Sequence, residues 1–134
     1  MRPRWIMAPH ESAILDANAK ALGADMDELM MTAAEHLANA LDGAPKPIWI
    51  LCGPGNNGGD GFRLAGMLEE CYVISTHQTQ KTAVAQRARD DYEGDIYTID
   101  NLPTKAPSTI VDCLLGAGSY GKPRGDILRL MESI

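Results

Sequence analysis

The stretch Ile48-Trp-Ile-Leu-Cys-Gly-Pro-Gly-Asn-Asn-Gly-Gly-Asp-Gly61 decides the fold of this chain. Its first five residues are all apolar, and a short continuous apolar run is typical of a central parallel strand that is buried on both faces. The next nine residues contain five glycines. A glycine-rich turn between a buried strand and a helix is typical of a ligand-binding loop in an α/β sheet. The stretch therefore predicts a strand, a binding loop and the start of a helix.

Outward from this stretch, apolar periodicity predicts helices that alternate with strands. Asp25 and Glu28 form a capping box, and the apolar stripe behind it predicts a helix over Met26–Leu41. This alternation favours a Rossmann-like three-layer α/β/α sandwich with a mostly parallel sheet and N-terminal helices. The other predicted elements are helices at Pro9–Leu22, Gly59–Glu70, Gln78–Tyr92 and Asp126–Ile134, strands at Ile48–Cys52, Cys71–Thr76, Asp95–Ile99 and Thr109–Leu115, and a second glycine-rich loop at Gly116–Gly125.

Length, charge and cysteine content exclude several classes of protein. The 134 residues suit one globular domain. The net charge of −6 disfavours a broad nucleic-acid surface, which would carry the opposite sign. No apolar run approaches the roughly 20 residues of a membrane span. The three cysteines are scattered in apolar contexts without a CxxC pair, as in reduced thiols. We therefore expect a cytoplasmic protein that binds neither nucleic acid nor a membrane.

Three familiar loop types fit the glycine-rich stretch poorly. A P-loop would end in Gly-Lys-Ser/Thr, whereas this loop ends in Gly59–Gly61, which argues against an ATPase. The spacing Gly53-x-Gly55-x-x-Gly58 matches the dinucleotide fingerprint. The next strand, however, ends in Ser75–His77 without the acidic residue that binds the adenosine ribose, which disfavours a dehydrogenase. A calcium-binding EF-hand would need a Glu where Met67 stands.

The polar residues at this edge of the predicted sheet are candidates for binding. Asn56 and Asn57 offer carbonyl oxygens that suit a hard cation. Asp60 would either cap the amides of the helix or contact a ligand. Asp112 is embedded in an apolar strand, where a carboxylate is costly to bury unless it is hydrogen-bonded or bound to a cation. His77 follows a strand at the same edge and is a candidate ligand contact.

With these residues in place, the chain resembles the YjeF N-terminal domain family, whose enzymatic members are NAD(P)H-hydrate epimerases. The run Gly53–Gly61 resembles the signature of that family. Val111–Gly118 resembles its Asp-x-x-x-Gly-x-Gly segment, and the resemblance covers most of the chain from about Glu11 onward. Weaker matches are Leu15-Asp16, Leu29-Met30, Ala33-Ala34 and Arg124-Gly125.

The resemblance implies an isomerase that interconverts the R and S hydrates of NADH and NADPH. A dehydratase, fused or separate, would then restore the cofactor. Asn57 and Asp112 would ligate a potassium ion, and the catalytic residues stay unassigned. The residues implied in substrate binding are Asn56, Asn57, Gly58, Gly59 and Asp60, together with a phosphate-wrapping loop of Gly116, Ala117, Gly118, Ser119, Tyr120, Gly121 and Lys122.

A third motif of the family, an Asp followed shortly by Pro-Ser-Gly, is not among the 134 residues. We therefore expect residues 1–134 to be a single YjeF N-terminal-like domain that is C-terminally truncated relative to the family. Two functions stay open at this point. One is the epimerase, and the other is a non-catalytic YjeF-type module for nucleotide binding or protein interaction. A homodimer is compatible with either function.

Overall fold

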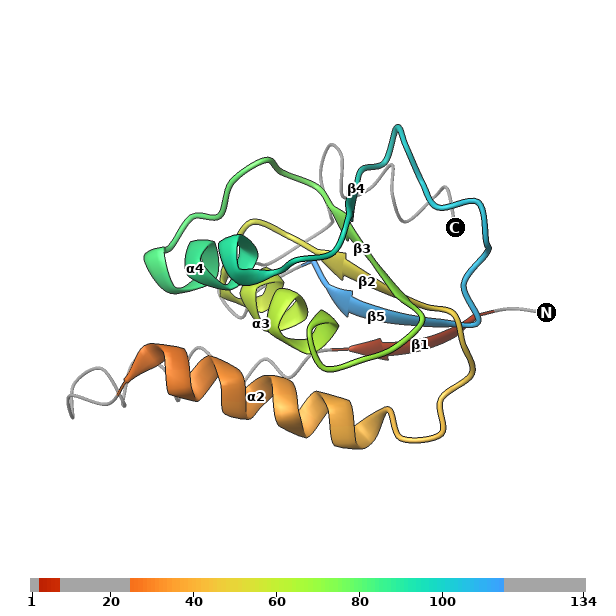
Figure 1. The fold of residues 1–134 in the computed structure, drawn as a ribbon, viewed down its shortest axis with the longest axis horizontal. Coiled ribbons are helices and arrows are strands. Elements are labelled where there is room, and N and C mark those ends of the chain that lie inside the picture. The colour runs from red at the N-terminus through yellow and green to blue at the C-terminus, as the bar shows by residue number, and fades with distance from the viewer. Residues whose placement is uncertain (1–2, 8–24, 115–134) are drawn as a thin grey trace.

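A computed structural model describes residues 3–7 and 25–114 (Figure 1). Its strands form one sheet in the order β1-β5-β2-β3-β4, and every neighbouring pair is parallel. This arrangement confirms the predicted Rossmann-like α/β class. The elements are β1 (Arg4–Met7), α2 (Met26–Ala40), β2 (Ile48–Cys52), α3 (Asn56–Ala65), β3 (Cys71–Ser75), α4 (Ala83–Asp91), β4 (Ile96–Tyr97) and β5 (Thr109–Cys113).

The central strand β2 is buried along its whole length, as its apolar sequence predicts. Alternate side chains of a strand point to opposite faces of the sheet. Ile50 and Cys52 pack on one face against α2, α3 and α4, whereas Trp49 and Leu51 belong to a second apolar cluster on the other face. Figure 1 shows the three helices together on one side of the sheet.

The second face of the sheet is covered in part by the segment after β4. Ile99 and Leu102 pack there against the cluster that contains Ile74, Ile110 and Leu114. Helices were also predicted at 9–22 and 126–134. Both lie outside the described residues, so the second helical layer stays a prediction.

The boundaries of α2 agree with the sequence to within one residue. Asp25 is its N-cap, because Oδ1 of Asp25 accepts a hydrogen bond from the backbone N–H of Asp27 at 2.9 Å. Met30 and Leu37 of the predicted apolar stripe are buried, and Ala34, which the prediction did not include, is buried beside them. Local propensity and tertiary packing therefore specify this helix consistently.

Helix α3 differs from its prediction at both ends, since the predicted range was Gly59–Glu70. It begins three residues earlier, at Asn56, and ends at Ala65. The early start adds Gly58 to Gly59 and Gly61 in the helix, and close packing requires these glycines: a Cβ at Gly61 would lie 2.6 Å from Sγ of Cys52. The early end leaves a turn before β3 in which Glu70 has a φ of 50°.

The other differences concern short elements. Helix α4 begins at Ala83 rather than Gln78, because Thr82 caps it and accepts a hydrogen bond from the N–H of Ala85 at 3.3 Å. Strand β4 has two residues where five were predicted. Strand β1 was not predicted at all. It pairs with β5, with Trp5 opposite Ile110.

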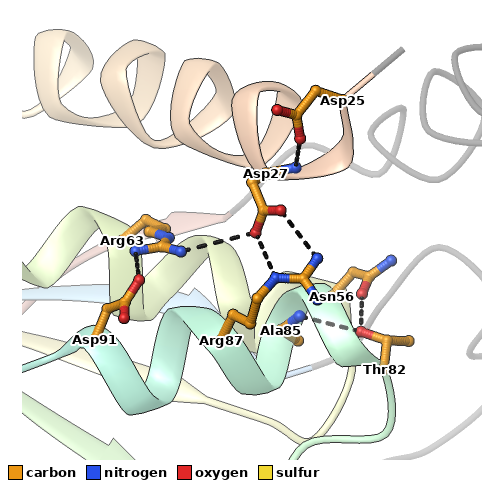
Figure 2. A network of polar contacts seen from close by, with 8 residues as sticks. All are labelled: Asp25, Asp27, Asn56, Arg63, Thr82, Ala85, Arg87 and Asp91. Atoms are coloured by element: carbon orange, nitrogen blue, oxygen red, sulfur yellow. Dashed lines mark hydrogen bonds and ion pairs between the residues drawn. The ribbon is translucent and has the colours of Figure 1, made fainter. Parts of the chain in front are cut away.

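A polar network joins the three helices on the outside of this layer (Figure 2). Arg87 donates two hydrogen bonds to the carboxylate of Asp27. Its Nε lies 2.9 Å from Oδ1, and its Nη2 lies 2.9 Å from Oδ2. Nη2 of Arg63 lies 3.9 Å from Oδ1 of Asp27, and Nη1 of Arg63 lies 2.8 Å from Oδ2 of Asp91. Asp27 at the start of α2 therefore contacts arginines of both α3 and α4.

The described residues also bear on two expectations from composition. Within them, no helix is long and apolar enough to cross a membrane. All three cysteines are free: Cys52 and Cys113 are buried, as predicted, while Cys71 is only partly buried. Burial raises the pKa of the Cys52 thiol, which keeps it protonated. These thiols are therefore packing residues in the described fold.

Candidate functional site

The glycine segment, defined as Gly53–Gly61, leaves the carboxyl end of β2 and continues into the first two turns of α3. In an open parallel sheet this edge is the usual place for a ligand. Three of the predicted binding residues, Asn56, Asn57 and Asp60, lie on these two turns. The predicted loop of residues 116–122 lies outside the described residues.

Two glycines of this segment are required by the backbone of the protein itself. A Cβ at Gly53 would lie 2.1 Å from the carbonyl oxygen of Leu114, and one at Gly58 would lie 1.9 Å from the carbonyl oxygen of Gly53. Gly55 differs, because a Cβ there would meet nothing within 4 Å in the described part of the chain. A ligand that approaches the backbone closely would therefore meet the segment at Gly55 rather than at Gly58.

The start of α3 leaves backbone donors for a ligand. Gly55 is the N-cap and supplies no side-chain hydrogen bond, and the first intrahelical bond runs from Gly59 N–H to Gly55 O at 3.3 Å. The first N–H groups of a helix lack intrahelical acceptors, and the helix dipole favours an anion there. The N-terminus of α3 at this edge is therefore suited to a phosphate group.

Asp60 does not cap this helix, because it is the fifth helical residue and lies beyond the first turn. Its side chain is 4% exposed, beneath the end of the sheet. Burial raises the pKa of the Cys113 thiol, and the charge of Asp60 raises it further. Asp60 is therefore a buried carboxylate of the glycine segment and is not the N-cap residue of α3.

Asn57 and Asp112 supply the oxygens that the potassium hypothesis needs. Asn57 is 4% exposed and Asp112 is 7% exposed. Asp112 lies opposite Leu51 in the register of β5 and β2, one residue before the end of β5. Its Oδ1 accepts a hydrogen bond from the N–H of Leu114 at 3.0 Å. Asn57 is the second residue of α3, which follows β2, and Asp112 lies near the end of the neighbouring strand β5. Buried amide and carboxylate oxygens of this kind are suitable ligands for a hard cation.

The structure adds the connection of residues 76–82 between β3 and α4, from which the sequence singled out only His77. The backbone N–H of Lys81 donates to the carbonyl of Pro54 at 2.7 Å. The hydroxyl of Thr82 donates to Oδ1 of Asn56, as Figure 2 shows. This segment therefore holds the glycine segment from the side of β3.

His77 lies at the carboxyl end of β3, as the sequence predicts. Its side chain is exposed, and Nδ1 lies 2.8 Å from the hydroxyl of Thr76. The neighbouring Ser75 is buried and donates to the carbonyl of His77 at 2.7 Å. His77 is therefore available at the edge where a dinucleotide would bind, and its contact with a ligand stays a prediction.

Two cavities lie away from the glycine segment. One of about 350 Å³ is lined by residues near the ends of α3 and α4, among them Met67 and Tyr92, and by Met31 of α2. The other, of about 440 Å³, lies beside the end of α2 and the start of β2. Of the predicted binding residues that the structure describes, none lines either cavity.

Comparison with known proteins identifies the family. A model of the family described as YjeF-related protein N-terminus matches residues 26–134, which include the whole glycine segment. The chain belongs to this family. The resemblance inferred from Gly53–Gly61 is therefore confirmed.

Several curated proteins share this family domain over much of the chain. The bifunctional NAD(P)H-hydrate repair enzyme Nnr of Methanospirillum hungatei is 33% identical over 147 residues, which cover 95% of this chain. The NAD(P)H-hydrate epimerase of Rhodopirellula baltica is 33% identical over 100 residues and 64% of this chain. Pyridoxine/pyridoxamine 5'-phosphate oxidase 1 of Arabidopsis thaliana, a chloroplastic protein, is 28% identical over 151 residues and 98% of this chain.

The chain spans only part of these relatives. The matched region is 30% of the length of the Methanospirillum protein, 28% of the Arabidopsis protein and 40% of the Rhodopirellula protein. Each of the three relatives is therefore much longer than the region that matches this chain.

Proposed function

We propose that this chain is a NAD(P)H-hydrate epimerase domain that interconverts the R and S hydrates of NADH and NADPH. The observation that carries the proposal is the family match over residues 26–134. The names of the Methanospirillum and Rhodopirellula relatives support the same reaction. The reaction class is therefore an isomerisation of a damaged nicotinamide cofactor.

The residues at the carboxyl edge would bind and orient the dinucleotide. The diphosphate would lie at the N-terminus of α3 beside Gly55, where the first helical N–H groups and the helix dipole favour negative charge. Asn56–Asp60 would form the substrate-binding segment, with Asn56 held by the hydroxyl of Thr82. The loop Gly116–Lys122 would wrap the phosphates, with Lys122 as a positive charge.

We also propose that Asn57 and Asp112 hold a potassium ion at this edge. Support comes from the burial of both side chains and from the pairing of β2 with β5. When bound, potassium would supply a fixed positive charge beside the diphosphate. The two residues would provide oxygen ligands, and Asp112 would keep its hydrogen bond to the N–H of Leu114.

The test is a direct assay of epimer interconversion. Purified R hydrate of NADPH is incubated with the chain, and the S hydrate is followed by HPLC with potassium or with lithium as the salt. We expect interconversion above the rate without protein, and a faster rate in potassium. An unchanged rate on addition of the chain in both salts would contradict the epimerase proposal.

A second candidate is the non-catalytic module that binds a nucleotide-like ligand. The observation that favours it is the Arabidopsis relative, whose name gives a different activity although 98% of this chain aligns with it. Calorimetry with the same hydrate separates the two candidates. Binding without interconversion would favour the module, and binding with interconversion would favour the epimerase.

We propose further that the domain works with a NAD(P)H-hydrate dehydratase in the cytoplasm, fused or separate. The bifunctional name of the Methanospirillum relative supports this pairing. With a dehydratase that accepts only one epimer, adding the chain should raise the repaired share of a mixed hydrate to nearly all of it. Light scattering in the same buffer would test whether a homodimer forms.

A further inference from the structure

Gln80 is the residue that contacts the glycine segment from outside it at two points. It lies in the connection between β3 and α4. Its Nε2 donates to the carbonyl oxygen of Gly53 at 2.8 Å and to that of Gly55 at 3.3 Å. These two carbonyls flank Pro54, which has no N–H of its own. One side-chain amide thus binds both ends of the turn that leads from β2 into α3.

Arg89 fixes which way the Gln80 amide points. Nη1 of Arg89 donates to Oε1 of Gln80 at 3.1 Å. If the amide were reversed, its oxygen would face two carbonyl oxygens and its NH₂ group would face a cationic guanidinium. Both contacts would then be unfavourable. The observed orientation is therefore the only one that satisfies the turn and the arginine together.

Arg89 is itself held in place by β3 and α3. The same Nη1 lies 2.9 Å from the hydroxyl of Ser75 and 2.7 Å from the carbonyl of His77. The guanidinium carbon lies 5.3 Å from the ring centre of Phe62, a cation–π distance. Because Phe62 and Ser75 are buried, the arginine has a rigid base from which to orient Gln80.

The position of Gln80 also helps to explain why the glycine segment has no space for a side chain at Gly58. A Cβ at Gly58 would lie 2.9 Å from Nε2 of Gln80 as well as against the carbonyl of Gly53. In a trans peptide the C=O and N–H groups point in opposite directions. Holding the carbonyl of Gly55 toward Gln80 therefore aims the N–H of Asn56, the first of α3, away from Gln80.

We infer that Gln80, oriented by Arg89, is a positioning residue for dinucleotide binding at the glycine segment. The inference rests on the proposed function, because it assigns Gln80 to the site where the diphosphate would lie. Gln80 acts through the backbone of Gly53–Asn56 and needs no contact with the substrate. Its loss should release the turn and misplace the donors at the start of α3.

The test compares Gln80→Met with Gln78→Met in the full chain. Met has about the length of Gln but cannot donate to the two carbonyls. Gln78 is an exposed residue of the same connection and serves as the matched control. A third variant, Gln80→Glu, retains the contact with Arg89 but places a carboxylate against the two carbonyls. NADPH hydrate is the probe, and KM and kcat are measured separately.

We expect Gln80→Met and Gln80→Glu to lower kcat/KM by about tenfold to a hundredfold, mainly through KM, since misplaced binding groups weaken substrate positioning. Gln78→Met should behave like the parent chain. Hydrogen–deuterium exchange of peptides that cover residues 53–61 should be faster in both Gln80 variants. Melting temperatures distinguish this role from a purely structural one, which would lower stability and leave kcat/KM unchanged.

The exchange measurement also separates this inference from the proposed function. If the parent chain neither binds nor interconverts the hydrate, the proposed function fails, and faster exchange at residues 53–61 would still support the positioning role. Unchanged exchange in Gln80→Met would overturn the inference whatever the activity. If the parent chain is active, faster exchange in Gln80→Met with an unchanged KM for the hydrate would also overturn the inference.

Discussion

Two polar regions of the molecule, the helix layer and the carboxyl edge of the sheet, differ in how exposed their contacts are and how tightly the chain packs around them. On the helix layer, the ion pair between Asp27 and Arg87 involves side chains at the surface: the Asp27 side chain is 38% exposed and that of Arg87 is 52% exposed. At the carboxyl edge, the half-buried amide of Gln80 binds the backbone of the glycine segment. There a side chain at Gly58 has no room.

The difference teaches which of the two regions fixes geometry. Exposed ion pairs are screened by salt and link elements through flexible side chains. Backbone in van der Waals contact with backbone tolerates no added atom without a shift of the chain. We therefore expect the carboxyl edge to be sensitive to small substitutions and the helix layer to be tolerant of them.

The largest effect should come from a methyl group at Gly58. Gly58→Ala forces its Cβ against the carbonyl of Gly53, and overpacking of this kind should lower the free energy of unfolding by about 3 kcal/mol. Gly55→Ala is the matched control. Its position is open and its φ is −90°, so its cost should stay within about 0.5 kcal/mol. Urea denaturation measures both, and equal midpoints would contradict the expectation.

The next effect concerns Asp112. Asp112→Ala removes the acceptor of the Leu114 N–H and should cost about 1–3 kcal/mol in unfolding free energy. Asp112→Asn retains an acceptor at that position and should preserve most of the stability. Both variants should weaken any dependence of activity on potassium, measured against lithium. A potassium response equal to that of the parent chain would remove Asp112 from the proposed cation site.

A smaller effect is expected at high pH in the helix layer. Burial raises the pKa of Tyr92 to about 12, above the ordinary phenol value near 10. The neutral phenol therefore stabilises the folded state fully below pH 10, and this contribution is lost as the pH rises toward 12. Tyr92→Phe should show a shallower fall in melting temperature over that range. A fall as steep as in the parent chain would argue that other groups cause it.

The smallest effect should come from Asp27. Hydrogen bonds from Arg87 hold the pKa of Asp27 below its ordinary value, so its contribution exists above pH 4 and is lost as the pH falls through the lowered pKa. Asp27→Asn should lower the melting temperature slightly at neutral pH and low salt, and less in high salt. Glu35→Gln, on the exposed face of the same helix, is the control. A loss of stability in Asp27→Asn as large as that in Gly58→Ala would contradict the expectation that the helix layer tolerates substitutions better than the carboxyl edge.

The sequence predicts the elements whose local pattern agrees with their packing. The stripe behind Asp25 predicts α2, and the five apolar residues of β2 predict a buried strand. Helix α3 is misjudged at its start because glycine has low helix propensity. Tertiary packing requires Gly58 there, because an added Cβ would lie 1.9 Å from the carbonyl oxygen of Gly53.

The candidate site was predicted where its residues are close in sequence, within the run Gly53–Gly61. Gln80 was missed because its contacts join residues 25 and 27 positions apart, and no spacing rule encodes such a contact. Strand β1 was missed for a similar reason, since four residues at an edge of the sheet carry almost no periodicity. Contacts between distant segments are what the folded structure adds.

The most direct test of this account is to map where NADPH hydrate binds by NMR titration of the ¹⁵N-labelled chain. The account predicts that chemical-shift changes concentrate at residues 53–61, at the connection 76–82 and at Asp112. Shift changes confined to the cavity of Met31, Met67 and Tyr92 in the helix layer would contradict it, and so would the absence of any change at saturating hydrate.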